Sequence, residues 1–156
     1  TILVLDQKDV PLERRVQSII DLNAQSYVLL IIGRPRDAQR VHHIDKTIMM
    51  EMMVTNRKQY HDFDRSGVPW KNIIAFVGHA LPEDQELLRM IHSKGTLCMA
   101  GTSRHLDKEL VTAAADQSPE LEARYRALLQ TGVDLIETDY PCEVGNMLYK
   151  PANNFR

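Results

Sequence analysis

Carboxylates and one lysine follow several short apolar runs of this sequence, at points where buried strands are expected to end. Asp6 and Lys8 follow the first run, Glu51 lies within the third, and Glu137 and Asp139 end the last. Carboxylate oxygens are the ligands that hard divalent cations prefer, and a lysine ammonium suits a phosphate. Brought to one rim, these residues would therefore support metal-assisted chemistry on a phosphate group.

Each of these residues also has a purely structural interpretation. Asp6 could cap the helix that follows, and Lys8 could be a solvated surface residue. Glu51 lies within "MMEMM" and must be solvated, paired or functional, because an unpaired buried charge is costly. Asp139 precedes Tyr-Pro, which is typical of a turn, and His79 is most simply an ordinary loop residue.

Six apolar runs predict the strands that would position these side chains. The runs span residues 1–5, 27–33, 47–54, 72–78, 96–102 and 133–138. Helical patterns lie between many of them, most clearly at 11–25, 82–95 and 120–132. The polar segments 36–45 and 55–67 are predicted as short helices or loops, and the tail after residue 144 as the start of a helix.

Strands that alternate with helices predict parallel pairing through crossover connections. The runs are apolar throughout, which indicates burial on both faces of the sheet. Two architectures fit this pattern, an open doubly wound sheet and a (β/α)8 barrel. No GxGxxG or GxxxxGK[ST] motif follows any run, which disfavours the nucleotide-binding doubly wound folds.

The composition is that of one globular domain. The chain has 156 residues, 44% of them hydrophobic, and a formal net charge of −2, which argues against a broad nucleic-acid interface. No run approaches the ~20 apolar residues of a membrane span. Cys98 and Cys142 lie in different elements without a CxxC motif, and this predicts two buried or incidental thiols rather than a disulfide framework or a zinc site. The sequence opens directly on a strand without Met, so we expect the natural chain to begin earlier, and we infer no compartment.

Three stretches resemble the glycerophosphodiester phosphodiesterases. "GVDLIETDYP" resembles that family's closing strand, and "LVLDQK" resembles its Ile-Glu-x-Lys strand. "LLRMIHSKGTLCMAGT" is similar to the helix and seventh strand that precede the closing strand. The resemblance implies a (β/α)8 TIM barrel, here incomplete with about six β/α units, in which residues 1–156 are the C-terminal part of a single barrel domain.

The chain also departs from the family pattern. No His-Arg-Gly run and no second-strand Glu-x-Asp pair precede "LVLDQK", and the dipeptide His61-Asp62 lies out of order. Asp6 stands where the family has Glu, and "MAGT" stands where it has Trp-Thr-Val-Asn. We therefore expect that the first two strands, which carry most of the catalytic residues, are absent from this chain.

The resemblance implies a role for several residues of the intact protein, a metal-dependent phosphoric diester hydrolase that acts on small glycerophosphodiesters. Asp6 would bind Ca²⁺ or Mg²⁺, and Lys8 would act on the phosphate. Glu51, Glu137 and Asp139 are candidates for substrate binding from their position alone. The missing N-terminal part of the barrel, or a second copy of this chain, is the expected macromolecular partner.

Two rival interpretations stay open at this point. One is a non-catalytic relative of the same barrel that binds phosphate or carbohydrate, which the shorter acid at Asp6 and the altered seventh strand would suit. The other is an unrelated α/β enzyme with an open sheet. Sequence upstream of these residues, with or without His-Arg-Gly and Glu-x-Asp, discriminates best between the hydrolase and the binding relative.

Overall fold

The computed structural model describes residues 2–6, 9–80, 82–112 and 118–149. Its strands form one sheet in which each strand lies parallel to its neighbour and the spatial order follows the chain. The six predicted strands are confirmed, although each is shorter than its apolar run. They are β1 (Leu3–Leu5), β2 (Val28–Ile32), β3 (Met49–Met53), β4 (Ile73–Gly78), β5 (Cys98–Gly101) and β6 (Leu135–Glu137).

Helices occupy the connections between these strands. They include α1 (Leu12–Asp21), α2 (Pro35–Ile44), α3 (Arg57–Asp64), α4 (Gln85–Ser93), α5 (Leu106–Thr112), α6 (Ser118–Gln130) and α7 (Pro141–Leu148). Both polar segments that could have been loops are therefore helical. In α3 the reason is local, because Asn56 caps the helix and accepts a hydrogen bond from the Gln59 N–H at 3.0 Å.

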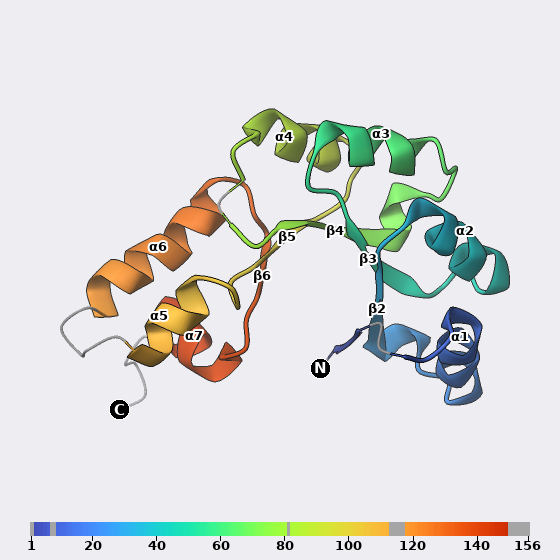
Figure 1. The fold of residues 1–156 in the computed structure, drawn as a ribbon, viewed down its shortest axis with the longest axis horizontal. Helices are drawn as coiled ribbons and strands as arrows, with labels where there is room; N and C mark the ends of the chain where they lie inside the picture. The colour runs from blue at the N-terminus through green and yellow to red at the C-terminus, as the bar shows by residue number, and fades with distance from the viewer. Residues whose placement is uncertain (1, 7–8, 81, 113–117, 150–156) are drawn as a thin grey trace, which may run out of the picture.

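The sheet curls into an arc, and helices α1 to α4 and α6 follow its convex side (Figure 1). A doubly wound sheet would instead carry helices on both faces. The chain is therefore a half-barrel of the TIM type, and the open-sheet alternative is wrong. Helices α5 and α7 pack against α6 near the last two strands rather than extending the outer row.

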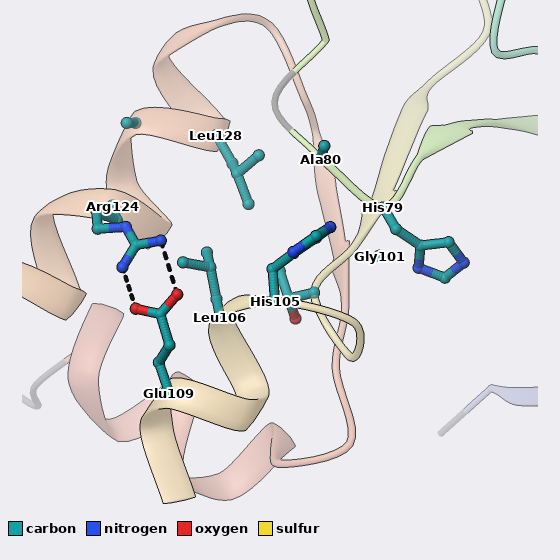
Figure 2. A pocket seen from close by; sticks show the side chains of 10 residues that line it. His79, Ala80, Gly101, His105, Leu106, Glu109, Arg124 and Leu128 are labelled. Atoms are coloured by element: carbon teal, nitrogen blue, oxygen red, sulfur yellow. Dashed lines mark hydrogen bonds and ion pairs between the residues drawn. The ribbon is translucent and has the colours of Figure 1, made fainter. Parts of the chain in front are cut away.

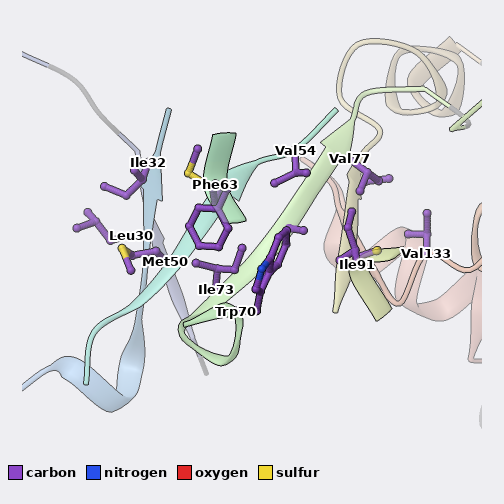
Figure 3. Packing of buried hydrophobic residues seen from close by; sticks show 14 of the residues in the cluster. Leu30, Ile32, Met50, Val54, Phe63, Trp70, Ile73, Val77, Ile91 and Val133 are labelled. Carbon is purple, nitrogen blue, oxygen red and sulfur yellow. The ribbon is translucent and has the colours of Figure 1, made fainter. Parts of the chain in front are cut away.

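Alternate strand residues face the helices and form the main core (Figure 3). Leu30, Met50 and Ile73 represent this set on three neighbouring strands. Between the sheet and α3, the rings of Phe63 and Trp70 meet edge to face with centroids 4.8 Å apart. The residues between these positions point to the concave side, where a second cluster forms from Leu29, Phe76 and Met99 with Met49, Ile74 and Leu135.

The amino ends of the last four strands are linked by hydrogen bonds that involve one side chain each. Asn72, just before β4, donates to the Lys46 carbonyl at 2.6 Å, and Thr96, just before β5, donates to the Trp70 carbonyl at 2.7 Å. Asp134, just before β6, accepts the first backbone N–H of β5 at 2.7 Å. One side chain thus links each of the last three strands to the strand before it. These links help to fix the register of the strands, and the register decides which residues reach the opposite rim.

Candidate functional site

Three carboxylates lie on the concave side, at the carboxyl ends of their strands. Glu51 is two residues beyond Met49 and Glu137 is two beyond Leu135, and both of those apolar residues belong to the concave cluster. Asp6 directly follows β1 and continues the side of Val4, which pairs in register with Leu29. The alternation of the strands therefore brings these acids, which are far apart in the sequence, to one rim.

Glu51 carries the strongest electrostatic signal in this group. Its side chain is only 5% exposed, and its Oε2 atom has no hydrogen-bond partner among the residues that the structure describes. Burial, then the charge of Glu137 and then that of Asp6, raise its pKa to about 7. Glu51 therefore lies close enough to both acids to feel their charge, and a bound cation would relieve the repulsion that the three share.

The pKa of Glu137 is raised as well, and this side chain is less buried than that of Glu51. Burial is the largest cause of its raised pKa, followed by the charges of Asp139, Asp6 and Asp107. Asp139 thus lies near the rim as well, although its backbone N–H serves the turn after β6 by donating to Asp107. Lys8, predicted to act on the phosphate, lies outside the described residues.

His79 occupies the space that the missing side chain of Gly101 leaves open. A Cβ at Gly101 would come within 2.5 Å of Nδ1 of His79 and 3.2 Å of the Phe76 ring. The imidazole also meets Phe76 at a centroid distance of 4.9 Å, and its Nδ1 is buried without a partner in the described part of the chain. Because Gly101 pairs in register with Glu137, His79 lies on the concave side beside the carboxylates. The sequence alone showed only an isolated histidine here. The glycine at position 101, near the end of a predicted strand, is the sequence feature that could have indicated a neighbouring side chain packed against the strand.

Burial lowers the pKa of His79, and the positive charges of Arg104 and His105 lower it further. The ring is therefore neutral at neutral pH, with one nitrogen able to accept a hydrogen bond and the other able to donate. It suits a role in orienting a polar ligand more than a role as a fixed positive charge.

Asp107 is the residue that sequence reasoning missed. It lies in the first turn of α5 and is 1% exposed. Its carboxylate accepts hydrogen bonds from the Tyr125 hydroxyl at 2.7 Å, from the Thr138 hydroxyl at 2.9 Å and from the Asp139 N–H at 2.7 Å. Burial alone would raise its pKa, but these bonds and one from Thr102 lower it. Asp107 thus anchors the chain as it leaves β6.

A pocket of about 310 Å³ lies beside this rim, between α5, α6 and the end of β4. His105, Leu106 and Leu128 line it, and the ion pair between Arg124 and Glu109 closes one side (Figure 2). The ring of His79 turns away from His105 and from this ion pair (Figure 2). His79 and Gly101 also line the pocket, so the pocket and the carboxylate group are neighbouring features that meet at these two residues.

Comparison with protein-family models gave no match, and comparison with curated proteins gave none either. The solved structures do match. A crystal structure of a glycerophosphoryl diester phosphodiesterase from Parabacteroides distasonis is 34% identical in sequence, with a TM-score of 0.86 over 96% of this chain. This chain belongs to the glycerophosphodiester phosphodiesterase family. It spans 51% of the length of that relative, or about half.

More distant structures of this family and of other barrels support the fold alone. A Galdieria sulphuraria protein assigned to the same phosphodiesterase class matches with a TM-score of 0.61 at 12% identity, over 90% of this chain and 51% of that one. A dihydropteroate synthase from Stenotrophomonas maltophilia matches with a TM-score of 0.53 at 13% identity, over 96% of this chain and 80% of that one. No helix in the described ranges of this family member is long and apolar enough to cross a bilayer.

Proposed function

We propose that this chain supplies the concave rim of a metal-dependent phosphodiesterase that hydrolyses glycerophosphodiesters. The observation that carries the proposal is Glu51, a buried carboxylate with an unpartnered oxygen, close to Glu137 and Asp6. This arrangement is found in a chain 34% identical to a glycerophosphoryl diester phosphodiesterase. A buried acid that lacks a partner and faces other acids is a strained arrangement unless a cation or a proton joins it.

The donor set fits a hard divalent cation. Asp6, Glu51 and Glu137 offer only oxygen atoms, which Ca²⁺ and Mg²⁺ prefer. Of these, Asp6 is the proposed primary ligand, and Glu51 and Glu137 complete the charge around it or bind substrate hydroxyls. When bound, such a cation supplies charge stabilisation to the phosphoryl group that is being transferred.

The residues of this chain have distinct tasks in that reaction. Glu51 holds a proton below about pH 7 and loses it to solvent above that pH, so that its carboxylate would then be free to bind the cation. The neutral ring of His79 orients a substrate hydroxyl or phosphate oxygen, since its buried Nδ1 needs a partner. Lys8 is proposed to contact the phosphate. Asp139 lies beside Glu137 and is proposed to bind the glycerol portion of the substrate.

The family's two histidines and its Glu-x-Asp pair are proposed to come from strands beyond this chain. Within the described residues, β1 pairs with β2 alone and β6 with β5 alone, so the sheet has two open edges. The side chains of Ile2, Leu3 and Val4 are 59%, 57% and 44% exposed, which leaves an apolar edge uncovered. We propose that the missing N-terminal strands cover this edge and complete the site, and that a second copy does so when they are absent.

Light scattering on the purified chain tests the edge proposal. We expect self-association, and we expect Leu3→Lys to reduce it, because a lysine on an edge strand opposes pairing. Val111→Lys is the matched control, since Val111 is 61% exposed on α5, away from the edge. A stable monomer of 17.9 kDa that unfolds cooperatively would refute the need for a covering partner.

A hydrolysis assay tests the function. We expect no release of glycerol phosphate from glycerophosphoethanolamine by this chain alone, because the family's two histidines and its Glu-x-Asp pair are proposed to come from strands beyond it. The longer protein with the upstream motifs should turn over, and a chelator should abolish its activity. Turnover by the 156-residue chain alone would overturn this account of where the chemistry lies.

A non-catalytic phosphate- or carbohydrate-binding relative is the second candidate. The shorter acid at Asp6 and the absence of an aromatic residue in "MAGT" favour it. The same assay decides, because a longer protein that binds the glycerophosphodiester in calorimetry and never hydrolyses it would be this relative.

A further inference from the structure

A second group of possible metal ligands lies at the opposite end of the strands. His92 is near the end of α4, Cys98 is the first residue of β5, and Asp134 lies just before β6. One ligand atom from each of the three lies within 4.8 Å of the others. This group is separate from the carboxylate rim, since it lies at the amino ends of the strands and shares no residue with it.

The backbone holds two of the three ligands in place. Asp134 donates its N–H to the Cys98 carbonyl at 2.8 Å, and its Oδ2 accepts the Cys98 N–H at 2.7 Å. The same Oδ2 lies 2.8 Å from Nε2 of His92. Gly132, whose φ is +100°, packs beside this ring, and a Cβ there would be in ordinary contact with it, 3.6 Å from the Cε1 atom. The three donors are therefore brought together by the fold and do not depend on chance rotamers.

Access to the group is one-sided. Cys98 is fully buried, whereas the side chains of His92 and Asp134 are 36% and 34% exposed. An ion entering from solvent would meet the imidazole and the carboxylate first and the thiol last. The open side also leaves room for a water ligand.

We propose that His92, Cys98 and Asp134 bind one zinc ion, with water as the fourth ligand. Sulfur, nitrogen and oxygen donors in one cluster suit Zn²⁺, whereas Ca²⁺ and Mg²⁺ prefer oxygen alone. Donor atoms around a tetrahedral zinc lie roughly 3.3–3.7 Å apart, within the spread of this cluster. The imidazole has only to withdraw slightly from its present contact with Asp134.

The proton balance of binding is simple. The S–H bond of Cys98 breaks, an S–Zn bond forms, and the thiol proton leaves to solvent. His92 binds through an unprotonated Nε2, so its remaining ring proton moves to Nδ1. The thiolate and the Asp134 carboxylate together neutralise the two charges of the ion.

Cobalt substitution tests this site directly, because Co²⁺ bound to a thiolate has a near-ultraviolet charge-transfer band that other ligands do not give. We expect the purified protein to bind one Co²⁺ with this band and to lose the band when one equivalent of Zn²⁺ is added. Cys98→Ala should abolish the band, and His92→Ala should weaken binding at least tenfold. Cys142→Ala is the matched control, since this exposed cysteine lies on α7, and it should leave the band unchanged.

Circular dichroism of each variant separates loss of metal from loss of fold. Should Cys98→Ala fail to fold, His92→Ala carries the test, because its partly exposed ring adds little to the core. Absence of the band in the wild-type protein, or a band that disappears with Cys142→Ala, would overturn the proposal. The His92–Asp134 contact would then be only a structural hydrogen bond.

Discussion

Two buried carboxylates at the same end of the sheet differ in almost every respect. Asp107 is 1% exposed and accepts hydrogen bonds from two side-chain hydroxyls and a backbone N–H, while Glu51 is 5% exposed with one oxygen unpartnered in the described chain. The pKa of Asp107 is lowered and that of Glu51 is raised to about 7. Both side chains are nearly inaccessible to solvent, so the opposite shifts in pKa follow from the hydrogen-bond donors around Asp107 and from the neighbouring acids around Glu51.

We infer from this contrast that Asp107 is a structural carboxylate and that Glu51 is the proposed ligand-binding one. Asp107 receives its donors from α6 and from the chain after β6, so its charge is used within the fold. Within the described residues no donor reaches Oε2 of Glu51, and the charges that raise its pKa, those of Glu137 and Asp6, are negative. The fold satisfies buried polar groups such as Asn72 and Thr96, but it leaves Oε2 of Glu51 without a partner among the described residues, at the rim where ligands bind in this architecture.

The largest effect is expected from removing Asp107. Asp107→Ala leaves the buried donors of Tyr125, Thr138 and Asp139 without an acceptor, and the free energy of unfolding should fall by about 3–5 kcal/mol. Urea unfolding at pH 7 measures it. Tyr125→Phe, which removes one donor and leaves the acceptor in place, should cost only about 1 kcal/mol. Equal losses for the two variants would mean that Asp107 is not the centre of this network.

Glu51→Gln should raise the free energy of unfolding, in contrast to Asp107→Ala, and the size of the gain should depend on pH. The folded-state pKa of Glu51 lies above its ordinary value of 4.5, so its penalty is absent below pH 4.5, grows as pH rises and is complete above pH 7. Relative to the variant, the wild-type protein should lose up to about 3 kcal/mol of stability over that range.

Thermal unfolding from pH 4 to pH 8 measures this difference, and Glu83→Gln in the exposed loop before α4 is the control. The control should show no such trend. A stability difference between wild type and Glu51→Gln that does not change with pH would mean that Glu51 is not strained in the folded state.

A smaller effect is expected at Gly101. Gly101→Ala places a Cβ where Nδ1 of His79 now lies, so the imidazole must move, at a cost of about 1–2 kcal/mol. Gly33→Ala is the matched control, because a Cβ there meets nothing within 4 Å. NMR of the His79 ring nitrogens should report a changed environment in the first variant and none in the second. An unperturbed His79 signal in Gly101→Ala would mean that His79 does not pack against Gly101 at the rim.

The strands and the acids of the concave rim could be predicted from the sequence because they follow local rules. Apolar runs gave the six strands, and the charge within "MMEMM" marked Glu51, since alternation leaves such a residue on one face. Asp107 could not be found this way, because its partners come from α6 and from beyond β6, and its own sequence context is an ordinary first helical turn. The same holds for His92, Cys98 and Asp134, because no spacing motif connects them. Of the three, only Cys98 was considered from the sequence, and no metal site was predicted there.

Calorimetric titration of the protein with Ca²⁺ tests most directly whether the rim around Glu51 binds a cation. At pH 8, where Glu51 is ionised, we expect one binding event that weakens at least tenfold in Glu51→Gln and weakens on acidification through about pH 7. Glu83→Gln should bind like the wild-type protein. Ca²⁺ binding that is equally strong in Glu51→Gln, or that is absent from the wild-type protein at pH 8, would contradict the claim that this unpartnered carboxylate marks a metal site.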